Sequence, residues 1–169
     1  LIVFFLIFFS LNKLAMAEEK KAYFAGGCFW CVEEAFEKTP GVLKAISGYT
    51  GGDLKNPTYE QVTYNETGHY EAVEVVYDPK VISYKQLLDV FWKNIDPYDA
   101  QGQFCDKGSS YLTAVFYQND EEKSAFEDSK KKLGKSDISD FVTHLKKLDV
   151  FYPAEDYHQD YYKNNPIRY

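Results

Sequence analysis

The chain has 169 residues and a formal net charge of −7, and its 45% hydrophobic and 18% aromatic content is enough for a sizeable core. This composition excludes an intrinsically disordered or collagen-like protein, and the acidic balance argues against nucleic acid or an anionic membrane as the main partner. Three cysteines are too few for a disulfide scaffold, and their odd number leaves at least one free thiol.

The first 17 residues have the pattern of a secretory signal peptide. Residues 1–9 read LIVFFLIFF, which is too short to span a bilayer, since a spanning helix needs about 20 apolar residues. Ala15, Met16 and Ala17 then give a small-x-small cleavage pattern before Glu18. We therefore expect residues 1–17 to be removed and the mature protein to be periplasmic or secreted, with no membrane association after cleavage. Because residue 1 is not Met, we expect the sequence to be clipped at this end; the alternative is that Met16 is the true start of a cytoplasmic protein.

Turn residues and hydrophobic periodicity divide the rest of the chain into strands and helices. In chain order we predict a strand over 23–25 that ends at two glycines, a helix over 28–38, a strand over 42–49 and then a long loop. A strand over 70–77 follows, then a helix over 83–95 that opens with a capping box, and a loop over 96–110. The last elements are a strand over 111–117, a helix over 119–132, a strand or strand pair over 141–151 and a short helix over 156–162. This order predicts one α+β domain over 18–169, a two-layer sandwich with a mixed β-sheet and a ferredoxin-like core.

The residues best suited to chemistry lie at 26–31, where a predicted strand meets two glycines and then a helix. Cys28 falls in the first turn of that helix, where unpaired backbone N–H groups and the helix dipole favour an anion. We therefore expect a thiol with a lowered pKa that is a good nucleophile at neutral pH. Cys31 lies three residues on, on the same helix face, and can act as a second redox partner. Phe29 and Trp30 place apolar surface beside the sulfur; the alternative is a pair of buried structural cysteines.

A metal site is not expected from the remaining residues. A structural zinc ion needs two further cysteine or histidine ligands beside the two cysteines of 26–31, but only Cys105 and three isolated histidines remain. We interpret His69 as a strand-entry residue and His158 as a structural or pocket-rim residue. His144 is interpreted as solvated.

The segment AGGCFWCVEEAF at 25–36 resembles the signature of the type A peptide methionine sulfoxide reductases, whose nucleophile is the first cysteine of a GCFW run. Six further segments resemble blocks of that family in the same order: SGYTGG at 47–52, NPTYEQV at 56–62, TGHYE at 67–71, VVYDP at 75–79, FCDKGSSY at 104–111 and AEDYHQDY at 154–161. Together they cover nearly all of residues 20–166, which makes the resemblance far more specific than a CxxC motif alone.

The resemblance implies a role for several positions. Cys28 attacks the sulfoxide sulfur, and Glu71 hydrogen-bonds and protonates the sulfoxide oxygen. The polar residues lining that site are Tyr59, Asp106 and Tyr111, and the apolar walls that hold the substrate's methyl group are Phe29 and Trp30. The implied substrate is the S-epimer of methionine sulfoxide, free or in proteins. No cofactor is implied beyond an external dithiol reductant such as thioredoxin, and we expect a monomer.

The residue types agree with these roles. A sulfoxide oxygen is a poor leaving group unless it is protonated, so the site needs an acid that is neutral at working pH. Glu71 shares a predicted strand face with Val73, Val75 and Tyr77, an apolar setting that is expected to raise the pKa of a carboxyl group. Tyrosine hydroxyls can donate to the same oxygen as negative charge develops on it.

The second thiol of the reaction is left open by the sequence. Many members of the family carry a resolving cysteine in a glycine-containing tail, and because this chain stops at Tyr169 we expect that tail to be clipped. Cys31, which must bend back across one helical turn, is slightly favoured over Cys105, which lies next to Asp106. A third alternative is that neither serves.

Two other functions compete with the reductase. One is a thioredoxin-like dithiol–disulfide oxidoreductase that uses Cys28 and Cys31, because CFWC begins a helix after a strand. The other is a secreted binding module whose 15 tyrosines line a protein interface. Alkylation of the thiols distinguishes the binding module from both enzymes, because a binding module keeps its function after alkylation and the enzymes lose theirs.

Overall fold

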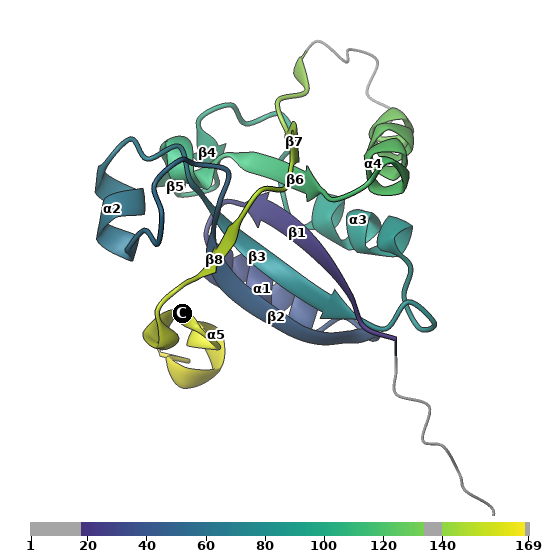
Figure 1. The fold of residues 1–169 in the computed structure, drawn as a ribbon, viewed down its shortest axis with the longest axis horizontal. Coiled ribbons are helices and arrows are strands. Elements are labelled where there is room, and N and C mark those ends of the chain that lie inside the picture. Colours follow the sequence, from purple (N-terminus) through teal and green to yellow (C-terminus); the bar gives the residue numbers. More distant parts are fainter. Residues whose placement is uncertain (1–17, 134–139, 168–169) are drawn as a thin grey trace, which may run out of the picture.

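The computed structural model describes residues 18–133 and 140–167 and is built around a six-stranded sheet (Figure 1). The strands of this sheet are β1 (Lys20–Gly26), β2 (Val42–Thr50), β3 (Tyr70–Tyr77), β6 (Thr113–Tyr117), β7 (His144–Lys147) and β8 (Phe151–Pro153). The helices are α1 (Phe29–Glu37), α2 (Tyr59–Tyr64), α3 (Tyr84–Lys93), α4 (Asp120–Lys132) and α5 (Tyr161–Asn164). A small hairpin pairs β4 (Gly102–Gln103) with β5 (Asp106–Lys107), and 3-10 turns cover Ser109–Tyr111 and Asp156–His158.

The sheet order confirms the predicted fold class. The strands lie in the order β7-β6-β1-β3-β2-β8. Strands β1 and β2 both pair antiparallel with β3 between them, and β6 pairs antiparallel with β1. Each of the units β1-α1-β2 and β3-α3-β6 is therefore a split βαβ unit, the ferredoxin-like arrangement. The pairing of β6 with β7 is parallel, so the sheet is mixed as predicted.

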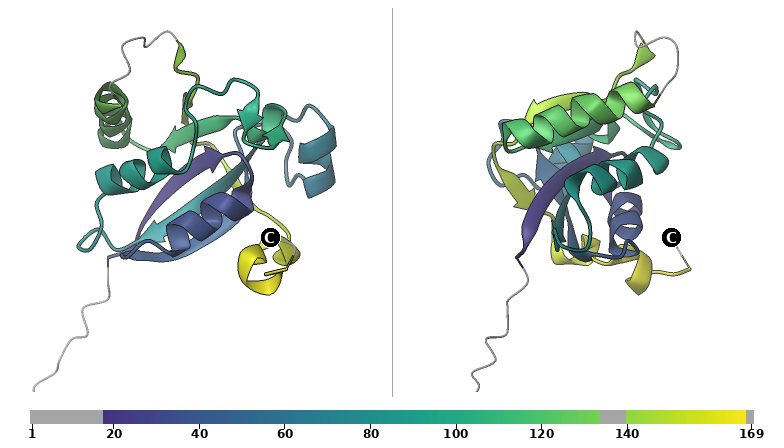
Figure 2. Two further views of the ribbon diagram at one scale, coloured as in Figure 1. Left: turned by 180° about the vertical axis from the view of Figure 1, so that it is seen from behind. Right: turned by 90° about the vertical axis from the view of Figure 1, so that its right-hand side faces the viewer.

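One face of the sheet is covered by α1, α3 and α4. The sheet lies in front of α1 in Figure 1, and α1 lies in front of the sheet in the reversed view of Figure 2. Buried apolar side chains of the sheet and of the helices form one core in this layer, and they include Phe24, Phe36, Val73, Leu88, Phe91 and Phe126. Burial of apolar side chains on this scale is the main stabilising contribution to a fold of this size.

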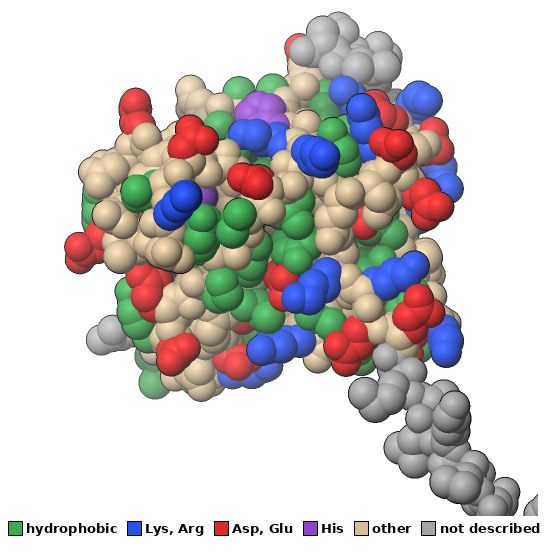
Figure 3. Space-filling view, in the orientation of Figure 1, with side chains coloured by type: hydrophobic (Ala, Val, Ile, Leu, Met, Phe, Trp, Pro, Cys, Tyr) green, Lys and Arg blue, Asp and Glu red, His purple; other side chains and the backbone are tan. Residues whose placement is uncertain are grey.

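The opposite face of the sheet is covered by the chain that connects β7 to β8. Tyr70 and Phe116 lie in a second buried cluster on this face, and Leu148 and Phe151 pack against it. Where the sequence predicted a strand or strand pair over 141–151, two strands form, the second of which extends to Pro153. They lie at opposite edges of the sheet, where β7 pairs with β6 and β8 pairs with β2. On the face seen in Figure 3, acidic and basic side chains are interspersed with exposed apolar ones.

His144 lies in the edge strand β7. Its side chain is exposed, in line with the interpretation from sequence. Its Nδ1 also forms a hydrogen bond of 2.8 Å with the hydroxyl of Tyr70, so it has a fixed partner as well.

Two short elements lie where the sequence predicted loops. Helix α2 is capped by Thr58, whose side chain accepts a hydrogen bond from the N–H of Gln61 in a complete capping box. The hairpin β4–β5 lies inside the predicted loop over 96–110. The capping box predicted at Ser83 and Gln86 is confirmed at the start of α3. Across the described ranges 18–133 and 140–167, the helices all fall short of the length and apolarity that a membrane span requires.

Candidate active site

One small cavity brings together the nucleophile, the acid, the polar residues and the apolar walls that the sequence suggested. It measures about 50 Å³ and is lined by Cys28, Phe29, Trp30, Tyr59, Glu71, Asp106 and Tyr111. These residues come from the start of α1, α2, β3, β5 and the 3-10 turn before β6. Cys28 and Glu71 therefore line one small space that also has aromatic walls.

A larger cavity of about 520 Å³ lies between the start of β1 and the helices α3 and α4. Its lining includes Lys20, Lys21 and Tyr84, and none of the cysteines. The smaller cavity is the candidate site because a nucleophile and an acid meet there, whatever the difference in size.

The position of Cys28 is fixed by the turn before α1. Gly27 has φ +84°, and a Cβ added to it would lie 2.5 Å from the Cβ of Gln103, so both the backbone conformation and the close approach require glycine. Cys28 is the N-cap of α1 and is half-buried. Its thiol therefore faces the cavity at the amino end of the helix, where the sequence predicted it.

The predicted lowering of the Cys28 pKa is wrong. The hydrogen bond with the Cys31 side chain, burial of the thiol and the negative charge of Glu71 together raise the pKa of Cys28 well above its ordinary value. The backbone N–H of Cys31 acts in the opposite direction, as expected at a helix amino end, but its effect is smaller. The resting site therefore holds Cys28 as a neutral thiol, because the helix end does not compensate for a buried acidic neighbour.

Glu71 is a buried acid next to that thiol. It projects from β3 on the same face as Val73 and Val75 and is 1% exposed. Its Oε2 accepts a hydrogen bond of 3.1 Å from the backbone N–H of Phe29, the first residue of α1. Burial raises the pKa of Glu71 to about 8, against the lowering effects of the Phe29 N–H and of Tyr111. As the sequence predicted, this carboxyl group is mostly protonated at neutral pH.

Two tyrosine hydroxyls complete the polar side of the cavity. Tyr111 is hydrogen-bonded to Tyr59 and to Glu71, and burial raises the pKa of both tyrosines so that each hydroxyl keeps its proton. The negative charge of Asp106 helps to raise the pKa of Glu71. The cavity thus presents three groups that can donate a proton or a hydrogen bond to one oxygen atom.

Residues from the end of the chain support the pocket, and sequence reasoning did not find all of them. His158 is 2% exposed, and its Nδ1 accepts a hydrogen bond of 3.2 Å from Trp30 Nε1. The ring of Tyr161 stacks on Trp30 with 3.7 Å between centroids. Glu155 accepts hydrogen bonds of 2.9 Å from the Tyr59 N–H and the Tyr49 hydroxyl. The AEDYHQDY block was the available signal for these residues, but nothing in its spacing indicates which aromatic side chains it contacts.

The histidines are structural in the described part of the chain. His69 is buried, its Nε2 lies 2.7 Å from the Leu54 carbonyl and its Nδ1 accepts from the Gly52 N–H, which confirms a strand-entry role. Burial lowers the pKa of His158, so this ring stays neutral behind the pocket wall.

The other two cysteines differ in their relation to the cavity. Cys31 is exposed, lies one helical turn from Cys28 and is hydrogen-bonded to it. Cys105 is exposed in the turn between β4 and β5, next to Asp106, and does not line the cavity. None of these three cysteines, all of which lie in the described part of the chain, forms a disulfide in this structure.

One group of carboxylates, from Glu33, Glu37 and Asp160, is close enough to share a cation. It lies outside the cavity, and the ammonium of Lys163 already pairs with Glu37 and Asp160. The candidate site itself offers one thiol and two carboxyl groups, a poor set for any of the common protein metals.

The chain resembles known proteins along almost its whole length. The model of a family described as "Peptide methionine sulfoxide reductase" matches residues 20–169. The chain is 54% identical over 157 residues to the peptide methionine sulfoxide reductase MsrA of Bacillus licheniformis, covering 91% of this chain and 87% of the relative. It is 52% identical to the MsrA of Bacillus subtilis strain 168 over 157 residues, covering 91% and 89%. The crystal structure of reduced Mxr1 from Saccharomyces cerevisiae superimposes with a TM-score of 0.80 at 30% identity, covering 90% of this chain and 89% of Mxr1.

These matches and the blocks around Cys28 and Glu71 point to the same group of proteins. Neither a thioredoxin-like oxidoreductase nor a binding module accounts for a match over residues 20–169. The chain belongs to the peptide methionine sulfoxide reductase family.

Proposed function

We propose that the chain reduces methionine sulfoxide to methionine with electrons from thiols, using Cys28 as nucleophile and Glu71 as acid. The observation that carries this proposal is the cavity in which a cysteine thiol and a carboxyl group with a pKa of about 8 lie together between aromatic walls. A thiol supplies two electrons to the sulfoxide sulfur only if the oxygen can leave, and a protonated carboxyl group makes it leave.

The cavity orients the sulfoxide group through contacts with its oxygen and with its methyl group. The oxygen lies toward Glu71, Tyr59 and Tyr111, which donate to it as its negative charge grows. The methyl group lies against Phe29 and Trp30, whose apolar surfaces exclude water. Because the acid and the aromatic walls are on different sides, only one sulfur configuration places the oxygen at the acid and the methyl group at the walls while the sulfur atom is open to attack by Cys28. We assign this to the S-epimer, in line with the resemblance to the type A reductases.

The reaction balances in two steps. The Cys28 sulfur bonds to the sulfoxide sulfur while the proton of Glu71 passes to the oxygen, and the thiol proton of Cys28 passes to Glu71, which is thereby protonated again. Collapse of this intermediate transfers the oxygen, as hydroxyl, to Cys28 and releases methionine, so that Cys28 becomes a sulfenic acid. A second thiol then attacks the sulfenic sulfur, a disulfide forms and the oxygen leaves as water.

We propose Cys31 as that second thiol. It is one turn from Cys28, is hydrogen-bonded to it and is exposed to an incoming reductant. Formation of the disulfide requires the first turn of α1 to distort, and this turn is held by bonds of 3.2 and 3.3 Å from the Cys31 and Val32 N–H groups to the Cys28 carbonyl. The regenerating reductant is a dithiol of the thioredoxin type; the yeast relative Mxr1 has been solved in complex with Trx2. No bound cofactor takes part in this cycle, and the enzyme acts as a monomer.

The proposed site of action is outside the cytoplasm. It depends on the sequence of residues 1–17, which lie outside the described residues and carry the signal-peptide pattern. Amino-terminal sequencing of the exported protein is expected to begin at Glu18. A protein that begins at Met16 and stays in the cytoplasm would contradict this proposal.

The function is tested with the purified chain, dithiothreitol and racemic methionine sulfoxide, with each epimer followed by chiral chromatography. Loss of the S-epimer alone is the expected result. Reduction of insulin disulfides with no loss of either epimer would instead support the dithiol–disulfide oxidoreductase. Inactivity in both assays, together with a function that is unchanged by alkylation of the thiols, would support the binding module.

A further inference from the structure

The indole of Trp30, one wall of the cavity, is held by the carboxyl-terminal segment, here residues 154–164. Its Nε1 donates to His158 Nδ1 at 3.2 Å, and the Tyr161 ring stacks on it at 3.7 Å with 7° between the planes. The segment runs beside α1 (Figure 2). Because it contacts the indole through both its edge and its face, the segment determines where the indole lies.

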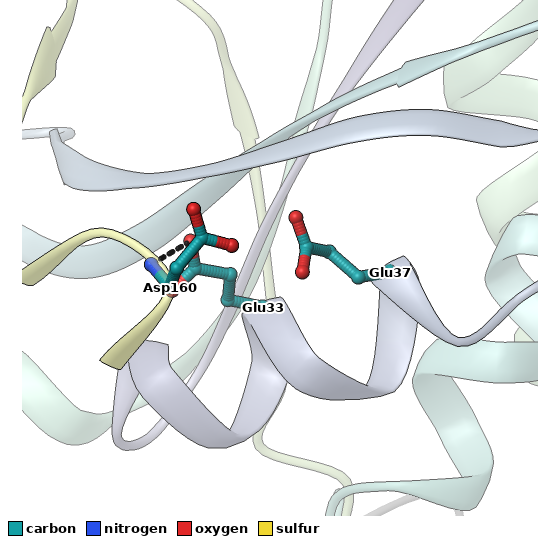
Figure 4. A group of neighbouring side chains, drawn as sticks. All are labelled: Glu33, Glu37 and Asp160. Carbon is teal, nitrogen blue, oxygen red and sulfur yellow. Dashed lines mark hydrogen bonds between the residues drawn. The ribbon is translucent and has the colours of Figure 1, made fainter. Parts of the chain in front are cut away.

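A buried carboxyl group of α1 also binds this segment. Glu33 lies on α1 three residues after Trp30 and is 1% exposed. Its Oε1 accepts a hydrogen bond of 3.0 Å from the backbone N–H of Asp160, drawn in Figure 4, and its Oε2 accepts one of 3.0 Å from Ser47 Oγ. A carboxyl group is costly to bury without such partners, and these partners join the helix, strand β2 and the segment at one point.

The residue that Glu33 holds has an unusual backbone conformation. Asp160 has φ +53°, in the left-handed region, which non-glycine residues adopt at some cost. This residue stands between Gln159 and the first residue of α5, Tyr161, so its conformation sets the direction in which Tyr161 leaves the segment. The hydrogen bond from its N–H to Glu33 keeps it there.

Other contacts also keep the segment docked, among them the hydrogen bond of 2.8 Å from the Tyr162 hydroxyl to Glu37 Oε2. Gln159 bridges to the backbone of Ser47, accepting from its N–H and donating to its carbonyl at 3.0 Å each. Lys163 pairs with Glu37 and Asp160 at the surface. Loss of the Glu33 bond is therefore expected to shift Asp160 and Tyr161 while the chain stays folded.

We propose that Glu33 is a positioning residue for the methionine sulfoxide pocket: through the Asp160 N–H it seats Tyr161 and His158 against Trp30. The proposal rests on the proposed function, in which Trp30 holds the substrate's methyl group. Glu33 does not line the cavity. Since the methyl contact is present in both the substrate complex and the transition state, its loss raises KM and leaves kcat nearly unchanged.

The test compares Glu33→Met, which keeps the length of the side chain but has no acceptor oxygen, with Glu33→Gln, which keeps an acceptor for the Asp160 N–H. KM for methionine sulfoxide is expected to rise about tenfold in Glu33→Met, the usual consequence of one lost buried hydrogen bond, and to stay within about twofold in Glu33→Gln. If Glu33→Met fails to fold, Glu33→Asp takes its place, because it withdraws the carboxylate by one methylene. The same rise in KM is expected for Glu33→Asp. The matched control is Glu34→Gln on the same helix, whose carboxylate pairs with Lys38 at the surface.

Fluorescence gives a readout that a merely structural role does not move. The chain has two tryptophans, so in a Trp92→Phe background all tryptophan emission comes from Trp30. Its emission is expected to shift to longer wavelength in Glu33→Met and not in Glu33→Gln or Glu34→Gln.

An unchanged KM and emission in Glu33→Met or Glu33→Asp, with only a lower unfolding midpoint, would overturn the proposal. Equal effects of Glu33→Gln and Glu33→Met would overturn it too, because the acceptor oxygen would then be irrelevant. If the unmodified chain does not reduce methionine sulfoxide, the proposed function fails, and the Trp30 emission still decides whether Glu33 positions that side chain.

Discussion

The backbone N–H of Phe29 donates a hydrogen bond of 3.1 Å to Glu71 Oε2. This contact joins the first residue of α1, which directly follows Cys28, to the acid on β3. One of the unpaired N–H groups of the helix start is thereby satisfied by a carboxyl group. The thiol and the acid therefore have a fixed relative position before any substrate arrives, which is the condition for fast proton transfer.

Glu71→Gln is expected to lower the rate of methionine formation at least about 100-fold, since general acid catalysis contributes a factor of that order. The amide oxygen still accepts from the Phe29 N–H, so the variant is expected to fold. The measurement is the rate of methionine formation in a single turnover. Glu74→Gln is the matched control, because Glu74 lies on the same strand, points to the other face and pairs with Lys21 and Tyr23. A Glu71→Gln variant as fast as this control would show that another group protonates the oxygen.

The same residue makes stability depend on pH. The pKa of Glu71 rises from an ordinary 4.5 to about 8 on folding, so between these values the folded state binds more protons than the unfolded state. The free energy of unfolding therefore falls as pH increases from 4.5 towards 8, and the loss of stability caused by Glu71 is constant above pH 8. Glu71→Gln removes this loss of stability. Urea unfolding of both proteins at about pH 5 and about pH 9 is expected to show the variant gaining relative stability at the higher pH; a difference independent of pH would contradict the raised pKa.

The sequence was informative where function depends on local pattern. The strand–Gly–Gly–helix junction, the apolar face of β3 around Glu71 and the alternation of strands and helices all follow from spacing of two or 3.6 residues. The resemblance supplied Tyr59, Asp106 and Tyr111, which no periodicity singles out among 15 tyrosines and 26 acidic residues.

What the sequence did not predict depends on distant contacts. The pKa of Cys28 is raised because the hydrogen bond with Cys31, burial and Glu71 together outweigh the helix end, a balance that cannot be predicted from the helix alone. The roles of Glu155 and Tyr161 depend on where the last part of the chain returns to α1 and α2. Similarly, β7 and β8 are close in sequence but lie at opposite edges of the sheet, since their partners are β6 and β2.

Alkylation of Cys28 tests the raised pKa directly. Because only the thiolate reacts with iodoacetamide, labelling of Cys28 at about pH 7.5 is expected to be slow and to increase steadily with pH. In Glu71→Gln the acidic neighbour is gone, so Cys28 is expected to react faster than in the unmodified chain above about pH 8, where Glu71 carries its negative charge. Peptide mass spectrometry after timed labelling gives the rate at Cys28 separately from the other thiols. Rapid labelling that does not change with pH would instead show a thiolate stabilised by the helix end.

Glu155 is expected to affect kcat by anchoring Tyr59. Burial alone would raise the pKa of Glu155, but the bonds from the Tyr59 N–H and the Tyr49 hydroxyl lower it, so a carboxylate anchors the start of α2. Glu155→Ala leaves the hydroxyl of fully buried Tyr49 without this partner, which is expected to cost about 1–3 kcal/mol of stability. The loosened Tyr59 is expected to lower kcat about tenfold. Steady-state kinetics and urea unfolding check both effects against Asp156→Asn, an exposed neighbour; loss of stability with unchanged kcat would separate Glu155 from catalysis.

The most direct test is one turnover of the reduced, unmodified chain with the S-epimer of methionine sulfoxide and no added reductant. Methionine is counted, and the oxidised protein is digested and mapped. The account predicts one methionine per chain and a Cys28–Cys31 disulfide, with Cys31→Ser still forming one methionine and holding one added oxygen on Cys28. Methionine formation that survives Cys28→Ser would contradict the central claim that Cys28 is the nucleophile.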